Sequence, residues 1–468
     1  MEIGTRLSEV LGKFLDLTSD QMKLTASNVA NQNTPGYTRE TVNFESSDAV
    51  SLSGYQGLDG SVSATAVSVR SRVLEQQLQQ QTQSSTASTA VLTALQNIQS
   101  MFGLTSTSTD ASSTTLGSAM NSFFSSLTAL FSDPTDVATQ TAVFTAASTL
   151  ASAFNSTSQG LSSEVTSLNS QIATAAQQVN GLTATVAQLN QQITSLSPNQ
   201  DAGTLEDARQ QAILQLSNIL GVDQITTQNN GVTLTASDGT VLVSGNQSYS
   251  LSTTTVGGNT AIVAGDPPTT LSDDIQGGAI GGMLQARDQA IPPMQSAIDQ
   301  LAYAIGTAVN TQNEAGTTSS GAAGTAIFTL PTTATGAAAT INVAVTSGTG
   351  IATAGAGEGA SGTTNALALA NLGTANIVSG QTASNNFASF IGSIGTAVSS
   401  ATTQNTANTA SLAQAQTQRD SLSAVSLDDE ATSLTNYQRS YEAAAKVFDI
   451  VDQMMADALN LGQETPVS

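Results

Sequence analysis

Residues 143–196 read VFTAASTLASAFNSTSQGLSSEVTSLNSQIATAAQQVNGLTATVAQLNQQITSL. Apolar side chains recur from Val143 to Leu196 in steps of four and three, an average of about 3.5 residues, which places them on one helix face and is typical of a left-handed coiled-coil seam. At 1.5 Å per residue the helix would be about 80 Å long, with Pro198 expected to end it. An apolar face of this length must be covered, so the sequence predicts an elongated bundle.

Other segments repeat the helical pattern. Residues 205–219 carry apolar side chains at helical spacing and predict an antiparallel partner after a short turn. Residues 284–308 and 387–415 do the same, and Pro292-Pro293 is expected to start or kink the first of these helices. The middle of the chain is therefore predicted to be a bundle drawn from segments far apart in sequence.

Two segments interrupt the helical pattern. Residues 222–275 alternate apolar and polar side chains in short runs, and Asp238-Gly239 separates two of these runs. This arrangement predicts hairpins and a small antiparallel β domain. Residues 316–365 consist largely of Gly, Ala and Thr, a composition that fits either a weak β insertion or a flexible loop.

The two ends of the chain carry matching apolar patterns. In residues 3–28 and again in residues 427–458, apolar side chains recur every seven residues. Each set forms one face of a helix, so the two helices are candidates to pair as a coiled coil. Ser426 is expected to cap the second helix, with Asp429 complementing its positive start.

The predicted fold is mainly α with β insertions. Its N- and C-terminal helices pair as a coiled coil, its middle is an elongated long-helix bundle, and a small antiparallel β domain is attached. The predicted domains are the terminal axial coiled-coil domain (1–45 and 426–468), the long-helix bundle (46–221, 276–315 and 366–425), the β domain (222–275) and the Gly/Ala/Thr-rich insertion (316–365).

The composition excludes most enzyme chemistry. The 468 residues include no Cys, His or Trp, which removes thiol and imidazole nucleophiles, His general bases and the usual zinc ligands. We therefore expect no enzyme, no cofactor and no metal site. Gly-rich residues 277–282 and 355–359 lack the Lys-Ser/Thr of a phosphate loop. Asp273-Asp274 and residues 428–430 could hold a cation, but a solvated loop and a helix start explain them better.

The charge limits the partners. The formal net charge is −23, and the long middle of the chain contains only two basic residues, Arg209 and Arg287. A surface this anionic repels phosphate backbones and anionic lipids, so neither nucleic acid nor a membrane is an expected partner. No apolar stretch near the N-terminus is long enough for a signal peptide, so any secretion is expected to occur without a cleaved one.

Residues 30–39, ANQNTPGYTR, join the first helix to an alternating strand at residues 41–44. Asn31 lies in the run that ends the helix. In Thr34-Pro35-Gly36-Tyr37, the proline fixes φ and the glycine permits the left-handed conformation, which predicts a type II turn. This local reading explains the residues as a helix stop and a turn and indicates no function.

The same ten residues resemble the signature of the bacterial flagellar axial proteins of the rod, hook and hook-associated group. Residues 426–448, SLDDEATSLTNYQRSYEAAAKVF, are similar to the C-terminal segment of that group, and residues 277–316 also resemble it. Hook and rod members look β-rich between their termini, whereas this chain carries a long helix there. The resemblance is therefore strongest to the hook-associated members at the hook–filament junction.

The resemblance implies a structural subunit that self-assembles through its terminal helices to join hook and filament. It implies export by the flagellar type III apparatus, an extracellular place in the flagellum, and a role in motility. The implied partners are further copies of the chain, the hook protein, the second hook-associated junction protein and an export chaperone at the C-terminal helix. Two alternatives stay open: a secreted adhesin or binding module on a helical stalk, and a hook or distal-rod subunit.

The candidate assembly residues are the apolar positions of the two terminal helices and the turn between the first helix and the strand. Arg39 is a further candidate, either for an ion pair between subunits with residues 428–430 or as an exposed charge. The full set is Ile3, Leu7, Val10, Phe14, Leu17, Leu24, Asn31, Thr34, Pro35, Gly36, Tyr37, Arg39, Leu427, Leu434, Tyr437, Tyr441, Phe448, Val451 and Met455.

Overall fold

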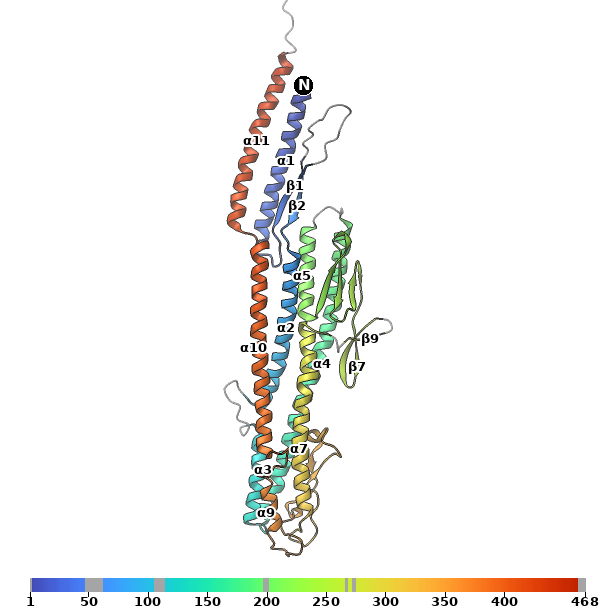
Figure 1. The fold of residues 1–468 in the computed structure, drawn as a ribbon, viewed down its shortest axis with the longest axis vertical. Helices are drawn as coiled ribbons and strands as arrows, with labels where there is room; N and C mark the ends of the chain where they lie inside the picture. Colours follow the sequence, from blue (N-terminus) through green and yellow to red (C-terminus); the bar gives the residue numbers. More distant parts are fainter. Residues whose placement is uncertain are drawn as a thin grey trace, which may run out of the picture.

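The computed structural model describes residues 2–46, 62–104, 114–196, 202–265, 268–271 and 275–461. It is an elongated molecule of long helices, with short strands along one side (Figure 1). The helices of these ranges are α1 (Glu2–Asn31), α2 (Arg72–Met101), α3 (Thr115–Ser132), α4 (Val137–Ser195), α5 (Gly203–Ile219), α6 (Gly278–Gln285), α7 (Ile291–Glu314), α8 (Ala337–Thr340), α9 (Thr364–Asn371), α10 (Ala383–Ser423) and α11 (Leu427–Leu461).

The strands of the described ranges form four small antiparallel sheets. Strand β1 pairs with β2, β10 pairs with β11, and the remaining strands form a four-stranded sheet in the order β3-β4-β5-β6 and a three-stranded sheet in the order β7-β8-β9. Their bounds are β1 (Glu40–Ser46), β2 (Val62–Ser68), β3 (Val222–Thr226), β4 (Val232–Ala236), β5 (Val241–Ser244), β6 (Gln247–Ser248), β7 (Ser252–Val256), β8 (Asn259–Ala264), β9 (Thr269–Thr270), β10 (Phe328–Thr329) and β11 (Asn342–Val343).

Helix α4 confirms the long helix predicted from the 3.5-residue pattern. It begins after Asp136, whose side chain accepts a hydrogen bond from the amide of Ala138, and runs for 59 residues to Ser195. Pro198, the expected stop, lies outside the described residues. The apolar face of α4 is buried within the same chain by α3 near its start, by strands of both larger sheets further along, and by α5 near its end. A succession of partners therefore covers the predicted seam.

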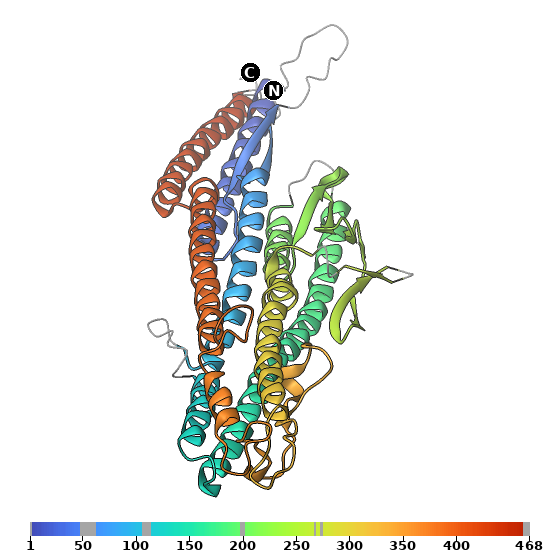
Figure 2. The same cartoon turned by 60° about the horizontal axis from the view of Figure 1, so that its bottom comes forward.

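Helices α2 and α10 lie side by side along the molecule (Figures 1 and 2), and polar side chains hold much of their contact. The Oγ of Ser88 and the Oγ1 of Thr89 donate to the Oδ1 of Asn405 at 3.1 and 2.8 Å. The Nδ2 of Asn408 donates to the carbonyl of Ser84 at 3.1 Å. Small Ser and Thr side chains allow two backbones to approach closely, so this pair needs no large apolar seam.

Glycines allow α6 to lie against α2 and α5. A Cβ on Gly282 would collide with the carbonyl oxygen of Ala87, and a Cβ on Gly278 would lie 2.5 Å from the amide nitrogen of Leu220. A π-helical turn, Ala286–Ala290, then leads into α7. Helix α7 begins at Ile291, so Pro292-Pro293 stands in its first turn, where the missing amides cost little. The expectation that these prolines start a helix is confirmed.

Residues 222–275 form the predicted small antiparallel β strands, arranged as two sheets. The Asp238-Gly239 turn is present, with Gly239 at φ +88°. Residues 249–251, one of the short alternating runs in this region, lie outside the strands, and β7 begins at Ser252. Leu251 is buried at that point because it faces α4, so its apolar character does not mark a strand.

Asparagines of α4 hold these sheets by pairing with both polar groups of one backbone residue. The Oδ1 of Asn180 accepts from the amide of Leu251 at 2.7 Å, and its Nδ2 donates to the carbonyl of the same residue at 2.8 Å. Asn190 makes the same pair of bonds with Val232, at 3.2 and 2.7 Å. We call this arrangement an asparagine clamp. It satisfies backbone groups that burial would otherwise leave unpaired.

The two arginines of the middle of the chain reinforce this docking. Arg209 is buried and donates from Nη1 to the Oδ1 of Asn190 at 2.9 Å and to the carbonyl of Asn230 at 2.5 Å. Arg287, also buried, donates from Nη1 to the Oδ1 of Asn169 at 2.9 Å and to the carbonyl of Thr260 at 2.5 Å. Each arginine therefore joins an asparagine of α4 to the backbone of the β region.

Residues 316–365 are folded, although they contain little regular structure. Phe328 is 1% exposed and is held by a clamp from Asn310 of α7, with bonds of 2.8 and 2.7 Å. Ile341 and Ile351 are fully buried. Only two residues of each short strand pair, so the weak β insertion was the better of the two alternatives and the flexible loop is wrong.

One assignment within the predicted helix bundle needs correction. Residues 62–68, placed in the bundle by the sequence, form strand β2, which pairs antiparallel with β1 so that Glu40 lies opposite Ser68. The alternating Val62-Ser63-Ala64 pattern is short and lacks large side chains, so it gives only a weak strand signal.

In the described ranges no helix combines the length and hydropathy of a membrane span.

We predict that Gly282→Ala lowers the free energy of unfolding by about 1–3 kcal/mol, because the added methyl group forces α6 away from α2. Gly181→Ala in α4 is the matched control, since nothing lies within 4 Å of a Cβ at that position. The free energy of unfolding of the control variant should be unchanged or rise by up to about 1 kcal/mol, because alanine has a higher helix propensity than glycine. Urea unfolding followed by circular dichroism measures both, and equal effects would contradict the packing argument.

Candidate assembly surface

Helices α1 and α11 lie side by side at one end of the molecule, beyond the helices of the rod (Figures 1 and 2). This is the terminal pairing expected from the sequence. The residues buried on α11 include Ala444 and Val451, and those on α1 include Thr18, Thr25 and Asn28. Both ends of the chain therefore contribute to one two-helix unit that projects from the rod.

Many of the predicted apolar positions on this pair remain open to solvent. On α1, Val10 is 56% and Phe14 is 42% exposed, while Leu17 and Leu24 are half-buried. The helix also contains Ile3 and Leu7, whose side chains lie outside the described residues. On α11, Val451 is buried; Leu427 and Tyr441 are exposed; and the half-buried positions are Leu434, Tyr437, Phe448 and Met455.

A second apolar stripe on α11 escaped the sequence analysis. Val447, Ile450 and Met454 are separated by three and four residues and therefore share one helix face. Ile450 is 56% and Met454 is 66% exposed. We call these three residues the outer stripe. Its spacing is present in the sequence, but the apolar face of this helix was predicted from the continuous seven-residue repeat on the neighbouring face.

The turn after α1 has the predicted geometry. Gly36 adopts φ +82°, and the amide of Tyr37 donates to the carbonyl of Thr34 at 3.1 Å, as a type II turn requires. Asn31 bonds back to the carbonyl of Ser27 and accepts from the hydroxyl of Thr34. Pro35 is exposed at the tip. These residues reverse the chain between α1 and β1, which is a structural role.

The buried side chain of Tyr37 stabilises this turn. Its buried hydroxyl donates to the Oδ1 of Asn28 at 2.9 Å, and that oxygen also accepts from the amide of Glu40 at 3.1 Å. The Nδ2 of Asn28 returns a bond to the carbonyl of Glu40 at 2.9 Å. Burial raises the pKa of Tyr37, which keeps its hydroxyl protonated as a donor. The geometry of the turn thus rests on an amide clamp of the kind seen in the rod.

A buried cluster of charged residues fastens the terminal unit to the rod. The carboxylate of Asp207, in the first turns of α5, accepts from the amide and the hydroxyl of Thr38 at 2.8 and 2.7 Å. Arg70 pairs with the same carboxylate at 2.5 Å, with Glu206 at 3.1 Å and with Glu75 at 3.5 Å. The cluster joins the segment after α1, the start of α2 and the start of α5.

Burial shifts two members of this region in the direction of their neutral forms. It raises the pKa of Glu75, against the opposing effect of Arg70. It lowers the pKa of Arg209 to about 10, although Glu206 favours the charged guanidinium. In both cases the opposite charges beside the residue counter the effect of burial. The cluster is closed, with a cavity of about 20 Å³ beside it, and so it serves as a fastening.

Arg39 corrects one expectation. It was a candidate for pairing between subunits, but its Nε lies 2.8 Å from the Oε1 of Glu430 in the same chain. Its amide donates to the carbonyl of Ser423, and its carbonyl accepts from the amide of Val69. These bonds tie the turn after α1, strand β2 and the α10–α11 connection together. Ser426 accepts from the amide of Asp429 at 3.4 Å, as its predicted capping role requires.

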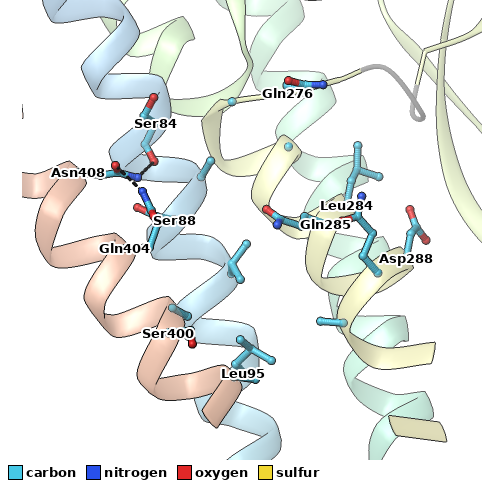
Figure 3. Close-up of a pocket in the computed structure, with 18 of the residues that line it drawn as sticks. Ser84, Ser88, Leu95, Gln276, Leu284, Gln285, Asp288, Ser400, Gln404 and Asn408 are labelled. Carbon is cyan, nitrogen blue, oxygen red and sulfur yellow. Dashed lines mark hydrogen bonds between the residues drawn. The ribbon is translucent and has the colours of Figure 1, made fainter. Parts of the chain in front are cut away.

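A groove of about 950 Å³ runs along the rod between α2, α10 and α6 (Figure 3). Small or uncharged side chains line it, among them Ser84, Ser88 and Gln404. Asp288 is its acidic member and is paired with the adjacent Arg287 at 2.7 Å. Gly277, part of the stretch considered as a phosphate loop, packs against Gln83 of α2. Asp288 is thus the one titratable residue among those that line the groove.

Two family models match this chain. "Flagellar hook-associated protein FlgK helical domain" matches residues 101–328, and "Flagellar basal body rod FlgEFG protein C-terminal" matches residues 416–461. Flagellar hook-associated protein 1 of Bacillus subtilis is 26% identical over 97% of both chains. The protein of the same name from Escherichia coli is 26% identical over 68% of this chain and 58% of its own length.

A solved structure has the same fold. The flagellar hook junction protein FlgK from Burkholderia pseudomallei superposes with a TM-score of 0.68 and covers 75% of this chain and all of its own. The two sequences are 19% identical. The likeness supports the arrangement of long helices and small sheets described above.

We predict that Glu75→Gln changes the pH dependence of stability. Because the folded protein raises this pKa above 4.5, it binds the proton more readily than the unfolded chain, so the wild type loses stability as pH rises through that window. Glutamine does not titrate. The free energy of unfolding of the variant relative to wild type should therefore be higher at pH 7 than at pH 4.5. Exposed Glu314→Gln is the matched control, and urea unfolding at both pH values is the measurement.

Proposed function

The chain belongs to the family of flagellar hook-associated protein 1, and we propose that it is a structural subunit of the bacterial flagellum that forms the junction between hook and filament. The observation that supports this most directly is the terminal unit. Helices α1 and α11 are paired and fastened to the rod, yet apolar side chains on both remain open. Exposed apolar surface of this kind is typical of sites where another protein binds.

Further copies of the chain are the occupants we propose for these surfaces. Packed around an axis, the terminal units of neighbouring copies would cover each other's exposed residues, including Val10, Phe14 and the outer stripe. Burying the three outer-stripe side chains from their exposed state would contribute of order 3–5 kcal/mol per subunit, before the loss of chain entropy. That is enough to favour assembly when many copies add together.

The fastening between terminal unit and rod fits a load-bearing part. Asp207 holds Thr38 and Arg70, and the amide of Arg39 donates to the carbonyl of Ser423 at the end of α10, so the terminal unit is attached at both of its chain connections. Polar bonds in a buried setting hold a fixed geometry. We propose that this lets a force applied to the terminal helices reach the rod without a hinge between them.

The remaining partners follow from the same family membership. We propose that one side of the assembled layer meets the hook protein and the other meets the second hook-associated junction protein. Before assembly, an export chaperone would cover the C-terminal helix, and the flagellar type III apparatus would carry the chain outside the cell. The exposed outer stripe gives a chaperone an apolar helix face to cover.

The first test is a deletion of residues 427–468. Without α11 the surface of α1 has no partner and copies should not assemble, so we expect a loss of swimming, detached filaments and flagellin in the medium. Cells that keep attached filaments after removal of α11 would contradict the junction role.

A finer test is Ile450→Asp, which places a charge in the centre of the outer stripe. Assembly would bury that charge without a partner, so we expect attached filaments to fall at least about tenfold while the free chain keeps its stability. The matched control is Gln453→Asp, which adds the same charge at an exposed polar position of the same helix. Electron microscopy counts filaments, and thermal unfolding checks the fold. Equal filament counts in both variants would remove the outer stripe from the interface.

A further inference from the structure

Strand β7 (Ser252–Val256) forms one edge of the three-stranded sheet on the side of the rod (Figure 1). All five of its residues are exposed, and Val256 is 56% exposed. In its sequence, STTTV, the four residues after Ser252 are β-branched, and β-branched residues favour extended structure. The strand is therefore well formed and open along its whole length.

The backbone of β7 presents unpaired polar groups to solvent. Gly257 and Gly258 have φ of +59° and +87°, which marks the two-residue turn between β7 and β8 as type I′. Across such a turn Val256 and Asn259 form a hydrogen-bonded pair, and the pattern alternates along the strands. The amides and carbonyls of Thr253 and Thr255 consequently point away from β8. Among the described residues they have no hydrogen-bond partner.

The edge also lacks the features that usually block strand addition, namely a charge, a proline or a bulge. The first edge of the neighbouring sheet is different. Glutamines of α2 cover β3, with Gln79 and Gln83 donating to the carbonyl of Val222 at 2.7 Å and Gln76 donating to the carbonyl of Gln224. Side chains of the rod thus cover the β3 edge, whereas the β7 edge is exposed.

The lack of charged residues around β7 favours a copy of the same chain as its partner. Residues 239–265 contain no Asp, Glu, Lys or Arg, in a chain of net charge −23. Two copies repel each other over most of their surfaces, and an uncharged region is where they can approach closely. A basic partner, in contrast, would find no carboxylate here to pair with.

The hairpin is held in a fixed place on the rod. Asn180 clamps Leu251 directly before β7 with two bonds of 2.7 and 2.8 Å. After the turn, the amide of Thr260 donates to the Oδ1 of Asn169 at 3.0 Å, and buried Arg287 binds both residues. A strand attached at both ends of its hairpin presents its edge in one orientation, which reduces the entropy lost when another strand adds.

We propose that β7 is a second contact between copies of this chain, at which a strand of the neighbouring copy adds to the sheet through Thr253 and Thr255. The contact rests on the proposed function, since an assembled layer is what brings the copies side by side. It lies on the side of the rod, away from α1 and α11, and would hold neighbouring subunits together independently of the terminal helices (Figure 1).

The test is site-specific photo-crosslinking in motile cells, with a benzophenone amino acid in place of Thr254 in the full chain. We expect an adduct of twice the subunit mass, identified by mass spectrometry as two copies of this chain. Ile225, which is 55% exposed on the covered strand β3, is the matched control position and should give little adduct. An adduct with a different protein, or equal yields at the two positions, would overturn the proposal.

A second variant tests the backbone contact itself. Thr253→Pro with Thr255→Pro removes the two outward amides and leaves the bonds to β8 in place, because proline is tolerated where an edge amide faces solvent. The adduct at position 254 should fall at least about tenfold, whereas Thr253→Ala with Thr255→Ala should preserve it. Circular dichroism and thermal unfolding establish that both double variants are folded. An undiminished adduct in the proline variant rejects strand addition.

Filament attachment in the same cells separates this proposal from the junction role. Cells with attached filaments but no adduct at position 254 would reject the β7 contact and leave the junction role intact. Loss of the terminal helices should abolish filaments whatever the state of β7. The two conclusions therefore fail on different observations.

Discussion

The apolar face of α4 is the constraint on which the rest of the molecule depends. A helix of 59 residues with one continuous apolar stripe cannot remain in water, and no single element among the described residues is long enough to cover it. Helix α3, both larger sheets and α5 therefore cover it in turn. The chain becomes a rod because its partners follow one another along α4, and the β strands lie on the side of the rod because α4 needs them there.

The terminal unit follows the opposite rule. Its two helices cover each other in part, and the remaining apolar residues face solvent on both. The contrast between a rod that completes its own core and an end that does not is the physical basis for assembly. The bonds to Asp207 and to the carbonyl of Ser423 make the contrast useful, since an incomplete surface can join neighbours firmly only if it is firmly attached to its own subunit.

Apolar periodicity made the main elements predictable, and its absence explains what was missed. Helices α4, α5 and α11 carry regular apolar patterns. Helix α2 buries polar side chains such as Gln79 and Ser88 against its neighbours, so its sequence carries no such pattern and its partner α10 was predicted only in part. The pairing of Arg39 with Glu430 joins residues 391 positions apart, a distance over which local pattern carries no information. The three- and four-residue spacing of the outer stripe is present in the sequence, but the seven-residue repeat on the neighbouring face was the stronger pattern.

The asparagine clamps have a consequence for the conditions under which the molecule can work. An amide side chain carries no charge and does not titrate, so the bonds of Asn180, Asn190 and Asn310 to backbone groups are unaffected by acidity and little weakened by dissolved salt. An ion pair in the same place would weaken as ionic strength rose. The side strands would thus keep their position from fresh water to brine.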